Sequence, residues 1–159
     1  MTEQWLRGPL PGLHPVAAHV FYTFAQCREE IALHSLGVPD IWKKLDPIAP
    51  LGFHLAHIAG SVNRLTTYLR GEQLTADQIA RLKSENTPGA TLTDLLAAMD
   101  AEFVATETLV RSVDPKTYEE PRAVGRQQLP TTVGGLIVHL AEHTQRHLGQ
   151  AILTAKLSR

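Results

Sequence analysis

The sequence predicts an all-α protein built as a four-helix bundle. Apolar residues recur at spacings of three and four over four long segments. Proline, glycine and threonine stand where such helices would begin or end. No segment demands a β-strand. With 159 residues, of which 43% are hydrophobic, the chain can bury one core, so we expect a single domain over residues 1–159.

The first long helix is predicted from Pro15 to about Gly37, after an irregular arm rich in glycine and proline. Val16, Val20 and Phe24 lie on its apolar face. Proline is favoured in a first helical turn, and glycine is favoured just after a last one. The segment VPDIWKKLDPIAP, which has three prolines and no clean period, follows as a loop.

The second long helix is predicted from about Leu51 to Arg70 and ends at Gly71. A short extra helix then begins at Thr75. Gln78 stands three residues later, which is the spacing of a capping box. Pro88 marks the end of this segment.

The third long helix is predicted to begin at Thr91 or Thr93 and to stop before Asp114, which precedes a proline. A polar loop follows. Thr131 or Thr132 caps the last helix, which runs to near the C-terminus. The loops between the helices are longer than those of a minimal up-and-down bundle, so they can cross a bundle end or cover a site.

Composition excludes several functions and favours a cytoplasmic location. The formal net charge is −1, which gives no electrostatic basis for binding nucleic acid. The longest apolar runs are shorter than the roughly 18 residues of a membrane span, and the N-terminus lacks the features of a signal peptide. The single cysteine, Cys27, sits among apolar residues and is interpreted as a buried, inert thiol.

Histidines in the last helix are the strongest functional signal. His139, His143 and His147 follow one another at intervals of four residues, so they share one helix face. Each interval rises about 6 Å along the axis, which places the outer two about 12 Å apart, too far for one ion. One metal can therefore take His139 with His143, or His143 with His147.

A second pair, His54 and His57, lies on the second predicted helix. Either of them can supply a third ligand if the two helices pack together. Three protein ligands leave a coordination position open, which is typical of catalytic rather than structural zinc sites. Imidazole ligands suit zinc, nickel, iron and copper. Arg64 falls on the same face as His57, where it can attract an anionic substrate or form a surface salt bridge.

Several stretches, in order along nearly the whole chain, match a known family. HTQRHLGQ resembles the HxxxHxGQ signature near the C-terminus of the DinB/YfiT-like family of bacterial helical bundles. GFHLAHIAGSVNRLTTYLRG resembles the second-helix segment of that family. PLPGLHP, LTADQIARLKSE and RQQLPTTVGGLIVHLAEHTQRH also resemble the corresponding segments.

The resemblance implies a four-helix bundle with a crossover connection, a homodimer, and a divalent metal held by His57, His143 and His147. His54, His139 and Gln150 are then candidates for alternative ligands or for side chains that orient the ligands. The glycine before Gln150 matches the family pattern and would allow close approach of another helix.

The resemblance also directs the functional hypothesis. Some members are similar to S-transferases that join a low-molecular-weight thiol, such as bacillithiol or mycothiol, to a small electrophile. The first hypothesis is therefore a thiol S-transferase that uses zinc or nickel, with iron as a further option, and acts on a small molecule. The alternatives are a hydrolase with a metal-bound hydroxide and a non-catalytic, metal-binding dimer of a stress response.

Overall fold

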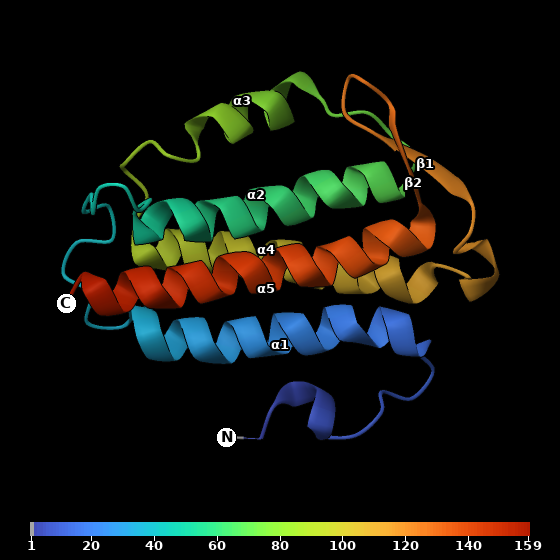
Figure 1. Cartoon of the computed structure of the whole chain (residues 1–159), viewed down its shortest axis with the longest axis horizontal. Coiled ribbons are helices and arrows are strands. Elements are labelled where there is room, and N and C mark those ends of the chain that lie inside the picture. Colours follow the sequence, from blue (N-terminus) through green and yellow to red (C-terminus); the bar gives the residue numbers. More distant parts are fainter. Residues whose placement is uncertain (1) are drawn as a thin grey trace.

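The computed structural model describes residues 2–159 and shows a mainly helical protein (Figure 1). A 3-10 turn over Gln4–Leu6 precedes the bundle. The helices are α1 (Pro15–Ser35), α2 (Leu51–Leu69), α3 (Ala76–Ser84), α4 (Leu92–Ser112) and α5 (Val133–Leu157). The predicted all-α four-helix bundle with a short extra helix is confirmed. No helix in the described part of the chain combines the length and apolarity needed to cross a membrane.

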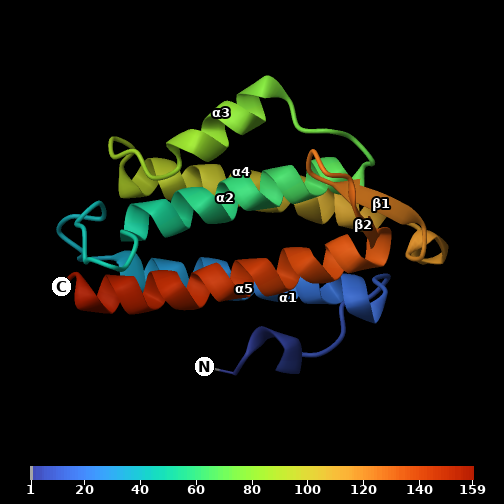
Figure 2. The same ribbon diagram turned by 45° about the horizontal axis from the view of Figure 1, so that its top comes forward.

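The four long helices form two parallel pairs that run in opposite directions. α1 and α5 lie side by side and run the same way, as do α2 and α4 (Figure 1). Hydrogen bonds from Gln145 to Gln26 and from Arg159 to His34 fix the parallel register of α5 on α1. Because α2 and α4 run the same way, the chain has to return along the length of the bundle between the end of α2 and the start of α4. The segment that contains α3 makes this crossover on the outer side of α2 (Figure 2).

Local capping explains where the helices begin. Thr75 and Gln78 form the predicted capping box at α3, and Thr91 forms a second one with Asp94 at α4. At α5 the hydroxyl of Thr132 accepts a hydrogen bond from the backbone N–H of Gly135 at 3.0 Å. Each threonine satisfies an N–H that has no partner inside its helix.

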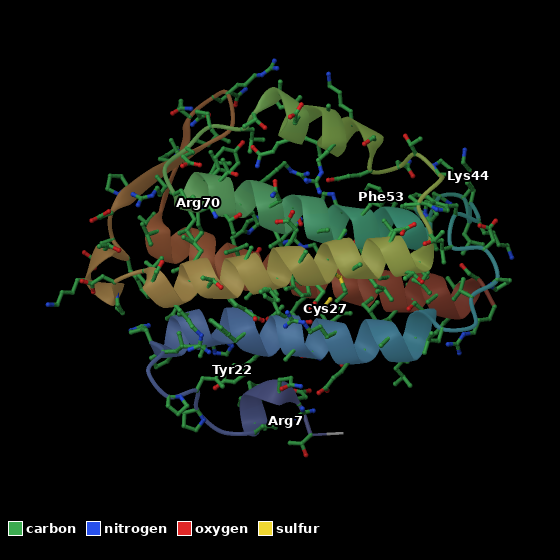
Figure 3. All side chains as sticks on the ribbon, turned by 180° about the vertical axis from the view of Figure 1, so that it is seen from behind. Arg7, Tyr22, Cys27, Lys44, Phe53 and Arg70 are labelled. Carbon is green, nitrogen blue, oxygen red and sulfur yellow. The ribbon has the colours of Figure 1, made fainter. Side chains whose placement is uncertain are left out.

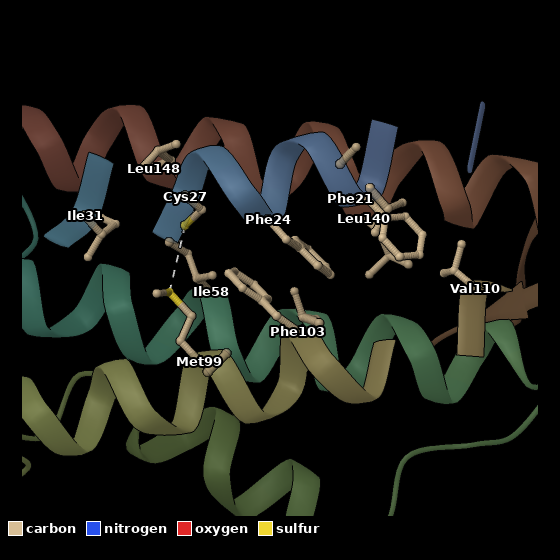
Figure 4. Packing of buried hydrophobic residues seen from close by; sticks show 14 of the residues in the cluster. Phe21, Phe24, Cys27, Ile31, Ile58, Met99, Phe103, Val110, Leu140 and Leu148 are labelled. Atoms are coloured by element: carbon tan, nitrogen blue, oxygen red, sulfur yellow. Dashed lines mark hydrogen bonds between the residues drawn. The ribbon is translucent and has the colours of Figure 1, made fainter. Parts of the chain in front are cut away.

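The core lies between the two pairs of helices (Figure 4). Phe24 of α1 and Phe103 of α4 are fully buried and stack with ring centroids 3.9 Å apart. The sulfur of Cys27 lies 3.9 Å from that of Met99, deep between α1 and α4 (Figure 3). The predicted burial of the Cys27 thiol is confirmed, and this burial raises its pKa to about 12.

One segment predicted as a polar loop contains a hairpin. Strands β1 (Pro121–Val124) and β2 (Leu129–Thr132) pair antiparallel, with Pro121 opposite Thr132. Four residues are too few to show a strand period, and Pro130 argues against a strand in sequence terms. Tertiary contact favours the hairpin here, because Arg122 Nε donates to the carbonyl of Leu69 at the end of α2 at 2.9 Å.

Trp42 fastens the loop between α1 and α2 to the bundle. Its indole N–H donates to the carbonyl of Ala90 at 2.9 Å, just before α4. Its ring covers Gly52, where an added Cβ would lie 2.7 Å from the nearest ring atoms. Only glycine permits this approach, so the loop is held where α2 begins.

Candidate metal centre

Three histidines from two helices converge between α2 and α5. One ring nitrogen from each of His57, His143 and His147 lies within 4.8 Å of the others, and we call these residues the three-histidine cluster. His57 comes from α2, and the other two come from successive turns of α5. Among residues 2–159, no other group of three or more His, Cys, Asp or Glu side chains comes this close together.

The nitrogen spacing fits one metal ion. Nε2 of His57 lies 3.1 Å from Nε2 of His143. Two imidazole nitrogens that bind one tetrahedral zinc at 2.0–2.1 Å are about 3.3 Å apart. A shift of a few tenths of an ångström would therefore seat both nitrogens on one ion. The residues present fit a divalent transition metal held by three imidazoles.

Glu85 determines which nitrogen of His57 is free. Its Oε2 lies 2.7 Å from Nδ1 of His57, and its side chain is only 6% exposed. A carboxylate only accepts hydrogen bonds, so Nδ1 carries the proton and Nε2 is left bare toward His143. A ligand histidine whose second nitrogen donates to a carboxylate is the usual arrangement around protein-bound zinc.

A buried ion pair holds Glu85 in place. Its other oxygen, Oε1, accepts a hydrogen bond from Nη1 of Arg64 at 2.5 Å. Gly60 makes room for this pair, because an added Cβ would lie 2.1 Å from Oε1 of Glu85. Arg64 is thus buried, and the predicted alternative of a surface salt bridge is wrong.

Burial keeps the two histidines of α5 neutral. It is the main cause that lowers the pKa of His143 to about 4 and that of His147 to about 3, and the neighbouring His57 lowers both further. Nδ1 of His143 is buried without a hydrogen-bond partner in the described chain. Neutral imidazole is the form that a metal requires.

His54 supports the cluster from the other side. It is 4% exposed, and its Nδ1 lies 3.4 Å from Nδ1 of His147, which leaves Nε2 of His147 free. Burial, followed by the electrostatic effect of the neighbouring His57, lowers the pKa of His54. The ring of His57 also stacks on Phe53 of α2, with centroids 5.4 Å apart.

The other predicted site residues lie outside the cluster. His139 has a side chain that is 43% exposed, and its Nδ1 lies 3.1 Å from Oε1 of Glu142. Gln150 is exposed and lines a neighbouring cavity. Nothing in this chain lies within 4 Å of a Cβ added at Gly149, so the predicted close helix approach there is wrong for the single chain.

Two cavities adjoin the three-histidine cluster and share no lining residue. The first, of about 250 Å³, includes His57, Arg64, Tyr68 and His143, and we call it the Arg64 cavity. The second, of about 440 Å³, includes Phe53, His54, His147 and Gln150, and we call it the Phe53 cavity. The cluster lies between them along the groove that α2 and α5 form.

Sequence reasoning missed Glu85. It directly follows the short helix α3 and is 28 residues from His57 along the chain. No motif connects the two positions. The one available signal was Arg64, a cation seven residues after His57 on a largely apolar helix, which indicates a buried acidic partner.

The fold and the cluster together define a class: a helical bundle in which three imidazoles from two helices can hold one metal ion. The family comparison places the chain within this class. Residues 2–151 match the DinB superfamily, and the chain belongs to it. This confirms the family resemblance seen in the sequence. No curated protein matches the chain.

Proposed function

We propose that the protein is a metal-dependent S-transferase that joins a low-molecular-weight thiol to a small electrophile. The observation that carries this proposal is the position of the three-histidine cluster between two separate cavities. A transfer reaction has two reactants that must meet at one centre. His57 and His143 line one cavity and His147 lines the other, so each reactant can reach the cluster through a cavity of its own.

His57, His143 and His147 would hold the ion, and zinc or nickel suits a set of imidazole nitrogens. A divalent cation bound there would lower the pKa of a thiol and favour the thiolate, which is the nucleophilic form. Glu85 keeps the bare nitrogen of His57 aimed at the cluster, and burial keeps the two α5 histidines neutral.

The reaction balances without a further reactant. The sulfur lone pair forms a bond to an electrophilic carbon, and the thiol proton is lost to solvent. If the carbon bears a leaving group, that group departs with its bonding electron pair. If the carbon belongs to a polarised double bond, the π electrons move to the neighbouring atom, which takes up a proton.

The test measures thiol-dependent consumption of monochlorobimane by metal-loaded protein. Cysteine, glutathione, bacillithiol and mycothiol serve in turn as the thiol. We expect turnover with at least one of them and its loss in His143→Ala. The control is His34→Ala, a histidine on α1 away from the cluster. Metal-loaded protein that accelerates none of the four reactions would refute the proposal.

Metal-dependent hydrolysis is a second candidate, because His139 and Glu142 form a hydrogen-bonded pair and His139 lines the same cavity as His143. A histidine so placed can act as a general base toward a water molecule. Hydrolysis of ester probes that disappears in both His139→Ala and His143→Ala would favour this function over S-transfer.

A further inference from the structure

The lining of the Arg64 cavity is selective for hydrogen-bond acceptors. Besides apolar side chains it contains Arg64, Tyr68, Ser61 and three imidazoles, those of His57, His139 and His143. No carboxylate is among the lining residues found in the described chain. Such a lining offers hydrogen-bond donors, among them the guanidinium of Arg64, and it favours a ligand that carries an anionic acceptor.

Arg64 keeps donors available for such a ligand. A guanidinium has five N–H groups, and the ion pair with Glu85 uses one of them, on Nη1. Within residues 2–159, no nitrogen of Arg64 is both buried from solvent and unpaired. Its remaining N–H groups are therefore not fully buried. Because Arg64 lines the Arg64 cavity, a ligand in that cavity can reach them.

Tyr68 adds a second donor to the same cavity. Tyr68 lies one helical turn after Arg64 on α2 and is 7% exposed. Its hydroxyl makes no hydrogen bond within the described chain and is not fully buried either. A tyrosine hydroxyl inside a protein usually has a hydrogen-bond partner, so this one is available to donate to a bound ligand.

We propose that the Arg64 cavity binds the carboxylate of a small α,β-unsaturated acid, with Arg64 and Tyr68 as the donors. This inference rests on the proposed S-transfer and names its electrophile. The cavity volume of about 250 Å³ is small for a ligand site and suits a small acid. The bulkier thiol then enters by the Phe53 cavity.

The chemistry explains why a carboxylate suits this position. The thiol sulfur donates a lone pair to the β-carbon, and the π electrons of the double bond shift toward the carboxylate. The α-carbon takes up one proton while the thiol loses one, so the net change is addition of S–H across the double bond. Negative charge grows on the carboxylate in the transition state, where Arg64 and Tyr68 stabilise it more than in the ground state.

The test separates binding from turnover. Butyrate and its neutral isostere butyramide are titrated into metal-free and zinc-loaded full-length protein, and binding is followed by NMR. We expect both forms of the protein to bind butyrate at least about 10-fold more tightly than butyramide. Tyr68→Phe should lose about 10-fold in butyrate affinity and keep its weak butyramide binding. Tyr22→Phe, on the surface of α1, is the matched control.

Arg64→Lys provides a second variant, because it keeps the charge beside Glu85 but loses the planar fork. The inference would be overturned if butyrate and butyramide bound equally well. It would also be overturned if butyrate bound only to zinc-loaded protein and with an affinity that Tyr68→Phe and Arg64→Lys left unchanged. Butyrate binding as expected without transfer to any thiol would instead refute the proposed function alone. Turnover of neutral electrophiles without butyrate binding would refute the inference alone.

Discussion

Replacing Glu85 by glutamine tests the organisation of the cluster. The carboxylate accepts hydrogen bonds from Nδ1 of His57 at 2.7 Å and from Nη1 of Arg64 at 2.5 Å. Glutamine has the same shape but only one acceptor oxygen, and its NH₂ group can only donate. One of the two partners must then face a donor. If it is His57, the proton moves to Nε2 and that nitrogen can no longer bind a metal.

The expected loss in metal affinity is about 10- to 100-fold, the usual effect of removing the partner of a ligand histidine. This corresponds to about 1.4–2.7 kcal/mol. The metal-free protein should lose about 1–3 kcal/mol of stability, because one buried hydrogen bond to a charged group is broken. For a chain of 159 residues, that lowers the melting temperature by roughly 2–12 °C.

The assay is competition for zinc against a chelator of known affinity, run well below the melting temperature. Glu102→Gln is the control, because Glu102 is also a partly buried carboxylate that accepts from α2, through Asn63 at 3.1 Å. We expect the control to bind zinc as the wild type does. Folded Glu85→Gln protein with wild-type zinc affinity would show that Glu85 does not hold His57.

Three further predictions follow from the same geometry. Elemental analysis should find metal retained in His139→Ala and lost in His147→Ala. The reverse result would favour His139 with His143 as the ligand pair on α5. Gly60→Ala should weaken zinc binding about as much as Glu85→Gln, because its Cβ would displace the carboxylate, whereas Gly149→Ala, with open space around it, should not. Denaturant titrations at several pH values test the lowered pKa values of His143 (about 4) and His147 (about 3). Below about pH 6.5 these two histidines bind protons in the unfolded chain but stay neutral in the native protein. The free energy of unfolding should therefore fall as the pH drops from about 6.5 toward 3, and it should not change through these groups above that range. A variant with leucine at both positions should show a shallower fall, and an equal fall would contradict this assignment.

The helices could be predicted well because their signals are local. A threonine cap and its partner three residues later lie within one turn, and apolar periodicity is a property of a single segment. The pairing of His143 with His147 was likewise one of only two arrangements that helix rise allows. The hairpin of β1 and β2 escaped prediction because its four-residue strands are too short to show a period, and because the contact of Arg122 with α2 joins residues 53 positions apart.

The sequence alone determined the all-α fold, the helix limits and a histidine-rich face on the last helix, because each of these depends on residues within a few turns of one another. Residue spacing left His54 and His57 as alternatives, and the family resemblance pointed to His57, which the tertiary structure places in the cluster. Only the tertiary structure decided that Glu85 and Arg64 form a buried pair behind it. Those contacts join residues 21 to 93 positions apart. They arise from how α5 and the crossover segment pack against α2, which no local pattern encodes.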